Sequence, residues 1–210
     1  MRAAGGRIGP NAVLQLLPVV EERLGAARVG PLLTAAGLAG PPEGTAMIPQ
    51  GEAVRLHRAV RAAEPVSWPG LLAEAGARTA DYILANRIPA PARTVLRLLP
   101  AGPAAHLLSG AIARHAWTFA GTGRFRAVDA WTFEIAGNPF VAGETSAHPL
   151  CVWHAAVFEG LYCSLVSERC RCREVRCGAQ QGAGGVCRFA IRLAGRRRGE
   201  MRAGNAGTVY

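Results

Sequence analysis

The 210-residue chain contains no lysine, no uncharged apolar run of membrane-spanning length and no hydrophobic signal core near its first residue. Its longest apolar stretch, residues 98–113, contains two prolines and a histidine, whereas a transmembrane helix needs about 20 mainly apolar residues. Residues 1–7 lack the apolar segment of an export signal. These absences predict a cytoplasmic protein without a transmembrane segment.

Motifs for nucleotide cofactors and for nucleic acids are also absent from the sequence. No Gly-x-Gly-x-x-Gly follows a predicted strand and no Walker-type loop is present. All 24 basic residues are arginine, and the net charge of +10 permits binding to acidic proteins, anionic lipid or nucleic acid. The arginines are scattered, however, and neither a helix-turn-helix pattern nor an RNA-binding aromatic motif accompanies them. We therefore predict no nucleic-acid partner and no nucleotide cofactor.

Half of the residues are hydrophobic, which predicts a folded chain. In the first half, apolar residues recur at helical spacing between prolines and glycines. Residues 1–115 are therefore predicted to form an N-terminal helical region, with helices over residues 13–25, 30–39, 50–63, 68–85 and 91–115.

Period-two alternation replaces the helical spacing after residue 123. Phe125, Trp131 and Phe133 fall on the same side of this alternation, which predicts one strand with one buried face. Glycines within residues 121–123 favour a hairpin turn that pairs this strand with a strand at residues 116–120.

The rest of the C-terminal half is predicted as a helix over residues 148–166 and strands over residues 168–177 and 186–193. The resulting β-β-α-β-β unit, residues 116–194, favours an antiparallel sheet covered by a helix and an α+β fold for the chain. Residues 195–210 are predicted to be a flexible basic tail.

Potential metal ligands of a closed site are spread over residues 151–187: Cys151, Glu174, Cys177 and Cys187. Three thiolates and one carboxylate can enclose a tetrahedral Zn²⁺ completely. Because the chain has no export signal, its six cysteines favour metal binding or buried thiols over disulfides. The first ligand would precede a helix, the next two would lie beside a strand end, and the last would follow a glycine-rich turn. We predict a structural zinc site.

The geometry of a regular strand sets a condition on this ligand set. Cys172 and Glu174 would share one strand face while Cys177 points to the other, so the chain must bulge between Glu174 and Cys177. Without a bulge, Cys172 is the alternative ligand. Cys163, Cys170 and Cys172 are otherwise predicted to be small buried hydrophobic residues. The lack of a Cys-x-x-Cys run disfavours an iron–sulfur cluster.

The order of motifs in the C-terminal half resembles a known family. An aromatic strand precedes, in chain order, Asn138-Pro139, Cys151 at a helix start, Phe158-Glu159-Gly160, Glu174-Val175-Arg176-Cys177 and Cys187-Arg188-Phe189. Over residues 123–193 this order resembles the vinyl-4-reductase domain. The opening motif at residues 7–11 and the helical first half resemble its pigment branch, the J proteins of bacteriochlorophyll biosynthesis, long labelled 4-vinyl (now 8-vinyl) reductases. Together these resemblances cover most of the chain.

The resemblance implies a pocket for small or planar apolar ligands between sheet and helices, in a protein that often forms a homodimer. It also implies that the residues matching the family's zinc ligands bind zinc here, namely Cys151, Glu174, Cys177 and Cys187. The loop of nine residues before Cys187 is longer than the family's usual loop.

Aromatic residues of the C-terminal half are candidates for lining a flat slot that accepts a Mg-tetrapyrrole: Trp131, Phe133, Phe158 and Tyr162. An ordinary aromatic core is the alternative interpretation of the same side chains. His154 lies one helical turn after Cys151 and is the candidate axial ligand, with His148 and His115 as alternatives. The alternating arginines of residues 169–173 would form a solvated face, contact ring propionates or dock an acidic partner enzyme.

Three functions are compatible with these features. In the first, the protein binds a divinyl Mg-tetrapyrrole of the protochlorophyllide type and presents it to enzymes of the bacteriochlorophyll pathway. In the second, it is an 8-vinyl reductase that uses an external reductant, because no redox cofactor motif is visible. In the third, it is a small-ligand sensor or an interaction module. A cytoplasmic location, with peripheral contact to the photosynthetic membrane, fits the first two.

Overall fold

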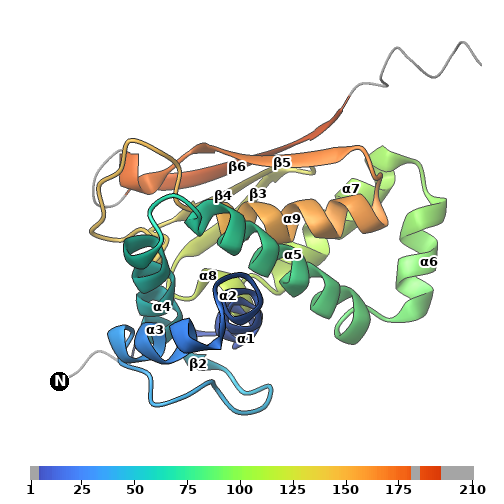
Figure 1. Cartoon of the computed structure of the whole chain (residues 1–210). Coiled ribbons are helices and arrows are strands. Elements are labelled where there is room, and N and C mark those ends of the chain that lie inside the picture. The colour runs from blue at the N-terminus through green and yellow to red at the C-terminus, as the bar shows by residue number, and fades with distance from the viewer. Residues whose placement is uncertain (1–4, 181–184, 195–210) are drawn as a thin grey trace, which may run out of the picture.

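The computed structural model describes residues 5–180 and 185–194. In it, a four-stranded antiparallel sheet lies along one side of a helical assembly (Figure 1). The predicted α+β class, with helices first and a β-β-α-β-β order after them, is confirmed. Residues 195–210, predicted to be a flexible basic tail, lie outside the described residues.

The helices of the first half follow the predicted segments closely. They are α1 (Asn11–Leu14), α2 (Leu16–Leu24), α3 (Val29–Ala35), α4 (Gln50–Ala63), α5 (Trp68–Asn86), α6 (Ala90–Leu98) and α7 (Ala101–Arg114). A 3₁₀ turn, Ala26–Arg28, joins α2 to α3. None of the described helices combines the length and apolar character needed to cross a bilayer.

The single helix predicted over residues 91–115 is wrong, because the chain divides there into α6 and α7. Leu99 is extended, with φ −76° and ψ 150°, and Pro100 follows it. A residue before proline avoids the helical region, and proline itself has no N–H to donate. The helix therefore ends at Leu98 and a new one begins after Pro100.

A two-stranded ribbon near the N-terminus has no counterpart in the sequence predictions. Its strands β1 (Arg7–Ile8) and β2 (Ile48–Pro49) pair antiparallel, with Ile8 opposite Ile48. Strands of two residues are too short for an alternation of apolar and polar positions to be recognised.

The prediction of one strand paired with residues 116–120 is also wrong. Residues Trp117–Ala120 form the short helix α8, and the alternating segment folds back on itself as β3 (Arg124–Asp129) and β4 (Thr132–Ala136). The Asp129 carboxylate accepts a hydrogen bond from the backbone N–H of Trp131 at 2.7 Å, an Asx turn that reverses the chain. Side-chain alternation continues on both sides of this turn, so the pattern alone conceals it.

The remaining elements are α9 (Val152–Leu165), β5 (Cys170–Arg176), a 3₁₀ turn (Gly178–Gln180) and β6 (Val186–Leu193). The strand order is β3-β4-β6-β5, with every neighbouring pair antiparallel. The final strand in the chain thus lies between β4 and β5. Its inward side chains, Cys187, Phe189 and Ile191, are buried.

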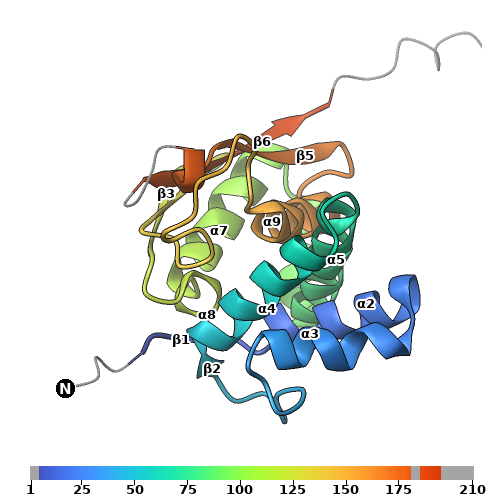
Figure 2. The same ribbon diagram turned by 60° about the vertical axis from the view of Figure 1, so that its left-hand side comes forward.

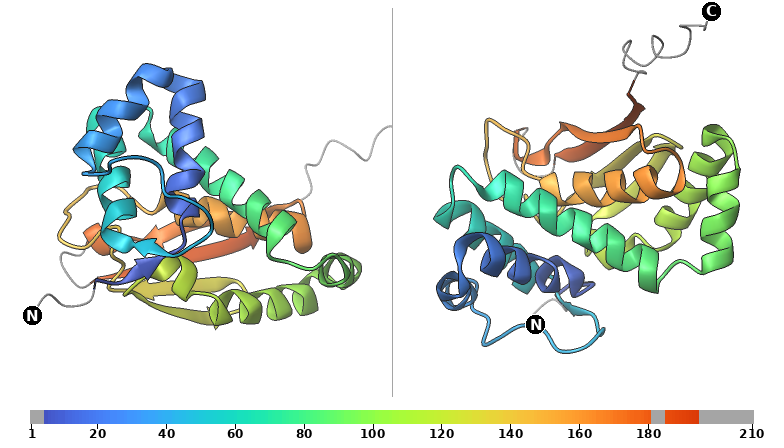
Figure 3. Two further views of the ribbon diagram at one scale, coloured as in Figure 1. Left: turned by 90° about the horizontal axis from the view of Figure 1, so that it is seen from below. Right: turned by 45° about the vertical axis from the view of Figure 1, so that its right-hand side comes forward.

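Helices cover one face of the sheet only. Helix α9 runs beneath β5 and β6, α7 lies against β3, and α5 packs on the side of α9 that faces away from the sheet (Figures 1 and 2). Helices α1 to α4 gather at the far side of α5 (Figure 3). The opposite face of the sheet carries no described helix.

Two glycines allow α5 and α9 to approach closely. A Cβ atom at Gly76 of α5 would lie 2.5 Å from the Trp153 carbonyl oxygen, and one at Gly160 of α9 would lie 2.6 Å from the Cβ of Ala80. Both distances are too short for a carbon atom to occupy without moving a helix. The small residues therefore set the distance between the helical layers.

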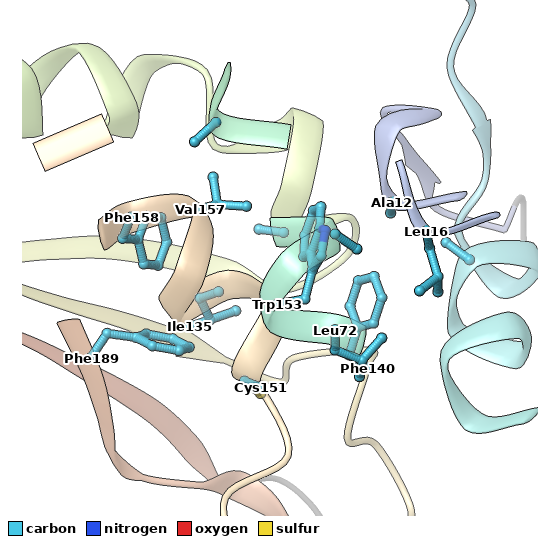
Figure 4. Packing of buried hydrophobic residues seen from close by; sticks show 14 of the residues in the cluster. Ala12, Leu16, Leu72, Ile135, Phe140, Cys151, Trp153, Val157, Phe158 and Phe189 are labelled. Carbon is cyan, nitrogen blue, oxygen red and sulfur yellow. The ribbon is translucent and has the colours of Figure 1, made fainter. Parts of the chain in front are cut away.

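One hydrophobic core extends through both halves of the chain. In Figure 4, Trp153 and Phe140 lie side by side between Leu72 and the N-terminal helices, and their rings stack with centroids 5.8 Å apart. The division into units 1–115 and 116–194 stays a prediction, and the shared core joins residues from both.

Two histidines are buried in this core as neutral rings. His57 Nε2 hydrogen-bonds to the Ala12 carbonyl at 2.9 Å, and His154 Nε2 to the Phe119 carbonyl at 3.2 Å. Burial lowers the pKa of His57 to about 3 and that of His154 to about 4.

Replacing Gly76 with alanine is expected to lower the free energy of unfolding by about 1–3 kcal/mol, because the added carbon forces α5 away from α9. The matched control is Gly70→Ala in the same helix, where a Cβ meets open space. That substitution should raise stability by up to about 1 kcal/mol through helix propensity. Urea unfolding measures both, and equal or greater stability of Gly76→Ala would contradict the close approach.

The buried histidines should make stability depend on pH. Between about pH 6.5 and pH 4 the unfolded chain binds protons that the folded chain excludes, so the free energy of unfolding falls as pH is lowered. Each histidine contributes up to about 1.4 kcal/mol per pH unit. In His154→Asn the slope in this window should be shallower by that amount, whereas His106→Asn, at an exposed position, should leave it unchanged. Parallel curves for wild type and His154→Asn would show that His154 does not titrate on unfolding.

Candidate metal centre and aromatic layer

Side chains from three parts of the C-terminal half converge beneath the sheet. Cys151 immediately precedes α9, Glu174 lies on β5, Cys177 follows β5 and Cys187 lies on β6. Their potential ligand atoms, three sulfurs and one carboxylate oxygen, all lie within 4.8 Å of one another. The structure therefore brings all four predicted ligands together, and we call them the Cys₃Glu cluster.

An irregularity at the end of β5 makes this convergence possible. The pairing of β5 with β6 shifts register between Glu174 and Arg176, and the strand ends at Arg176. The bulge turns the thiol of Cys177 to the same side as the Glu174 carboxylate. Cys172, the alternative ligand, lies outside the cluster, and its backbone N–H donates to a carboxylate oxygen of Glu159 at 2.7 Å.

Hydrogen-bond donors point at the sulfur atoms of the cluster. The Asn138 amide nitrogen lies 3.2 Å from Cys151 Sγ and 3.6 Å from Cys187 Sγ, and the Gly178 backbone N–H donates to Cys187 Sγ at 3.3 Å. The Asn138 side-chain oxygen accepts from the Phe140 backbone N–H at 3.1 Å, which orients the amide nitrogen toward the sulfurs. Sulfurs that accept such bonds are suited to the thiolate form.

Glu174 contributes one engaged and one unengaged oxygen. Its Oε2 accepts a hydrogen bond from the Cys151 backbone N–H at 2.8 Å. Its Oε1 is buried and has no hydrogen-bond partner among the described residues. A buried carboxylate oxygen without a partner is costly. Burial raises the pKa of Glu174 to about 7.

Without a cation, the thiols of the cluster must share protons. Burial raises the pKa of Cys151 well above its usual range. Hydrogen bonds from the Cys151 and Cys187 thiols lower the pKa of Cys177. One ionised sulfur is thus stabilised by protonated neighbours. A divalent cation would remove this conflict, because it holds coordinating thiols in the deprotonated form.

The donor set fits a metal ion better than a disulfide. The Sγ atoms of Cys151 and Cys187 are 3.4 Å apart, whereas a disulfide bond measures about 2.05 Å, and all six cysteines are free. Zinc–sulfur bonds of about 2.3 Å in a tetrahedron place sulfurs about 3.8 Å apart, a spacing that small shifts of these side chains would reach. The cluster could therefore hold a metal ion.

The rings predicted to line a ligand slot lie in one layer between the sheet and α9. Phe133, Phe158 and Tyr162 are fully buried, while Trp131 is half-buried at the border of the layer. Ring centroids are 5.0 Å apart for Phe133 and Phe158, 6.0 Å for Phe133 and Tyr162, and 5.8 Å for Trp131 and Tyr162. The rings contact one another, so a flat ligand between them would have to separate them.

Additional rings that were not predicted for the slot complete this aromatic layer: Phe119, Phe125 and Phe189. Period-two alternation already placed Phe125 on the face of Phe133. Phe119 was missed because residues 116–120 were assigned to a strand. Asn138 was missed as a contact of the sulfurs, although the Asn-Pro dipeptide was noticed as a family motif.

His154 is occupied by a structural contact. Its Nε2 hydrogen-bonds to the Phe119 carbonyl, and its ring lies against Phe140 and Trp153 with centroids 5.0 and 4.9 Å away. Axial coordination of a pigment metal through Nε2 would require this hydrogen bond to break. The alternatives, His115 and His148, are exposed.

Two cavities lie away from the centre of the aromatic layer. The larger, about 610 Å³, is lined by Arg97 of α6 and by residues 163–168 at the end of α9. It begins one residue after Tyr162. The smaller, about 340 Å³, lies between α3 and α4.

Comparison with protein families matches the vinyl-4-reductase domain to residues 131–193, which contain every member of the Cys₃Glu cluster. The chain is 48% identical over 196 residues to the bacteriochlorophyll synthase 23 kDa chain of Cereibacter sphaeroides, covering 92% of this chain and 94% of that protein. It is 41% identical to the protein of the same name from Rhodobacter capsulatus, covering 91% and 89%.

Solved structures with a similar fold are H-NOX proteins. An H-NOX mutant from K. algicida gives a TM-score of 0.57 at 13% identity, covering 90% of this chain and 98% of that one. An H-NOX protein studied for haem distortion gives 0.52 at 12%, covering 89% and 95%. These likenesses show a shared fold only. The identity to the curated proteins, together with the domain match, shows that this chain belongs to the family of the bacteriochlorophyll synthase 23 kDa chain (BchJ) of bacteriochlorophyll biosynthesis.

Proposed function

We propose that the protein binds a divinyl Mg-tetrapyrrole of the protochlorophyllide type and presents it to enzymes of the bacteriochlorophyll pathway. The observation that carries this proposal is the 48% identity, over nearly the full length, to a bacteriochlorophyll synthase chain. Membership of that pathway narrows the ligand to its pigment intermediates. The identity of the partner enzymes and the predicted homodimer stay predictions.

The fold supports a tetrapyrrole as the ligand. One of the similar structures is of an H-NOX protein with a haem, which is itself a tetrapyrrole. At 12% identity this likeness assigns no residue. It supports only the idea that such an arrangement of helices and sheet can accommodate a planar macrocycle.

The aromatic layer is the proposed contact surface for the macrocycle. Trp131 is its half-buried ring and lies 5.8 Å from Tyr162, centroid to centroid. The cavity of about 610 Å³ begins beside Tyr162 in the chain and is bordered by α6. Helix α6 buries none of its nine residues, and Leu98 at its end is 80% exposed. Displacement of this weakly packed helix would open a path toward Trp131 and Tyr162.

We further propose that the Cys₃Glu cluster binds Zn²⁺ as a structural ion. Cys151, Cys177 and Cys187 would supply thiolates, and the unpartnered oxygen of Glu174 would complete the tetrahedron. The ion would join the start of α9 to the β5–β6 hairpin and hold one wall of the aromatic layer against the other. With four protein ligands the ion has no open position for substrate.

The reductase alternative requires an external partner. Converting a vinyl group to an ethyl group consumes two electrons and two protons, and the sequence contains no motif for a nucleotide that would deliver them. Presentation of the pigment to another enzyme needs only binding and release. We therefore favour the carrier role.

Titration of protochlorophyllide into the purified protein should shift and broaden its Soret band if the pigment binds. Trp131→Ala should weaken binding about tenfold, a typical loss for an aromatic side chain at a binding surface. Trp117→Ala is the matched control, because Trp117 is 57% exposed on α8. An unshifted Soret band at micromolar protein would refute pigment binding, and equal losses in both variants would refute the role of Trp131.

Chromatography distinguishes the carrier from the reductase. The isolated protein, given divinyl protochlorophyllide with either reduced nicotinamide or reduced ferredoxin, should produce no monovinyl product. Monovinyl product formed at a rate proportional to the protein concentration would show that the chain is itself a reductase.

Elemental analysis should find about one zinc per chain in the wild-type protein. Cys177→Ser should lose most of this zinc, because removal of one ligand from a closed site weakens it severely. Its thermal midpoint should fall by about 10 °C, corresponding to several kcal/mol for a chain of this size. Cys163→Ser is the control, because its thiol lies outside the cluster. Wild-type protein without metal, or with an iron–sulfur absorption band, would overturn the zinc proposal.

A further inference from the structure

The outward face of the four-stranded sheet is dominated by arginines. Alternation along the strands directs seven of them away from the helices: Arg124 and Arg126 on β3, Arg171, Arg173 and Arg176 on β5, and Arg188 and Arg192 on β6. Six of these are exposed and Arg188 is partly exposed. We call this surface the arginine face. The acidic residue among its described strand positions is Glu134 of β4.

The arginine face differs from the rest of the molecule in how its charges are compensated. On the helical side, arginines pair with carboxylates: Arg23 with Glu74, Arg28 with Glu64, Arg58 and Arg61 with Glu144, and Arg78 with Glu22 and Glu74. On the arginine face, Glu134 alone contacts Arg126 at 2.6 Å and Arg188 at 3.5 Å. The other five make no ion pair within the described part of the chain.

Like charges even stand directly opposite each other across strands. Arg171 pairs in register with Arg192, and Arg176 with Arg188. Directly opposed like charges destabilise a sheet. A cluster of this kind, retained at a cost in stability, indicates that an anionic surface lies against it when the protein functions.

We propose that the arginine face docks on an anionic lipid surface. The positive charge extends across β3, β6 and β5, and four strands at about 4.8 Å spacing make a broad, shallow sheet surface. Neither of the two cavities described above lies on this face. The exposed side chains of Val128 and Val175 lie among the arginines and supply apolar contacts at headgroup depth. Extended charge with scattered apolar side chains fits a membrane surface better than a peptide groove. This inference is independent of the proposed pigment and zinc sites.

Sedimentation with vesicles tests this inference on the full chain. Wild-type protein should bind vesicles of phosphatidylcholine with about one-third phosphatidylglycerol, should not bind phosphatidylcholine alone, and should dissociate as salt increases. The variant Arg124→Gln, Arg173→Gln, Arg192→Gln removes three charges of the face. At about fivefold per arginine, it should bind about 100-fold more weakly.

The matched control removes the same number of charges from the helical side, as Arg87→Gln, Arg93→Gln, Arg114→Gln. It should bind nearly as well as wild type, and circular dichroism should show both triple variants folded. Equal binding to neutral and anionic vesicles, or equal losses in the two variants, would overturn the proposal. Binding to polyglutamate without binding to anionic vesicles would also overturn it and would identify the face as a docking site for an acidic protein.

Discussion

Three thiols and a carboxylate buried within 4.8 Å of one another impose the strictest chemical constraint on this molecule. Ionised groups of one sign cannot share a buried site without a compensating cation, and Glu174 Oε1 has no hydrogen-bond partner there among the described residues. The groups come from the start of α9, the end of β5 and the middle of β6. Whatever satisfies them also determines how the helix sits against the sheet. The proposed zinc ion would meet this requirement with one ligand set.

The aromatic layer depends on the same placement of α9. Phe158 and Tyr162 of α9 pack against Phe133 of β4, and on its other side α9 approaches α5 through Gly76 and Gly160. A helix held at one end by polar ligands and along its length by close packing provides a rigid wall. Weakly packed α6, by contrast, borders the cavity near Tyr162. The two sides of the proposed pigment site thus differ in how firmly they are held.

The charge distribution divides the molecule in another way. The arginines of the helical side are largely paired with carboxylates, whereas most arginines of the open sheet face are not. Composition explains the number of arginines but not this segregation. If the arginine face meets lipid, the pigment path near α6 lies on the opposite, helical side and stays accessible to partner enzymes.

Most helices could be predicted from the sequence, because apolar spacing and prolines are local signals. The turn at Asp129 could not, since alternation continued through it and the deciding hydrogen bond joins the Asp129 side chain to the Trp131 backbone. The cluster ligands could be named from residue types, order and family resemblance. Their convergence depended on the register shift after Glu174, which pairing with β6 produces.

The sequence by itself determined the residue types of the cluster, the alternation that gathers arginines on one strand face, and the family to which the chain belongs. Only the tertiary structure decided that His154 is occupied by the Phe119 carbonyl, that the aromatic rings contact one another, and that no described helix covers the arginine face. The physical reason is that periodicity reports which side of an element is buried. The partner that buries it, and the gap left between them, depend on packing between residues far apart in the chain.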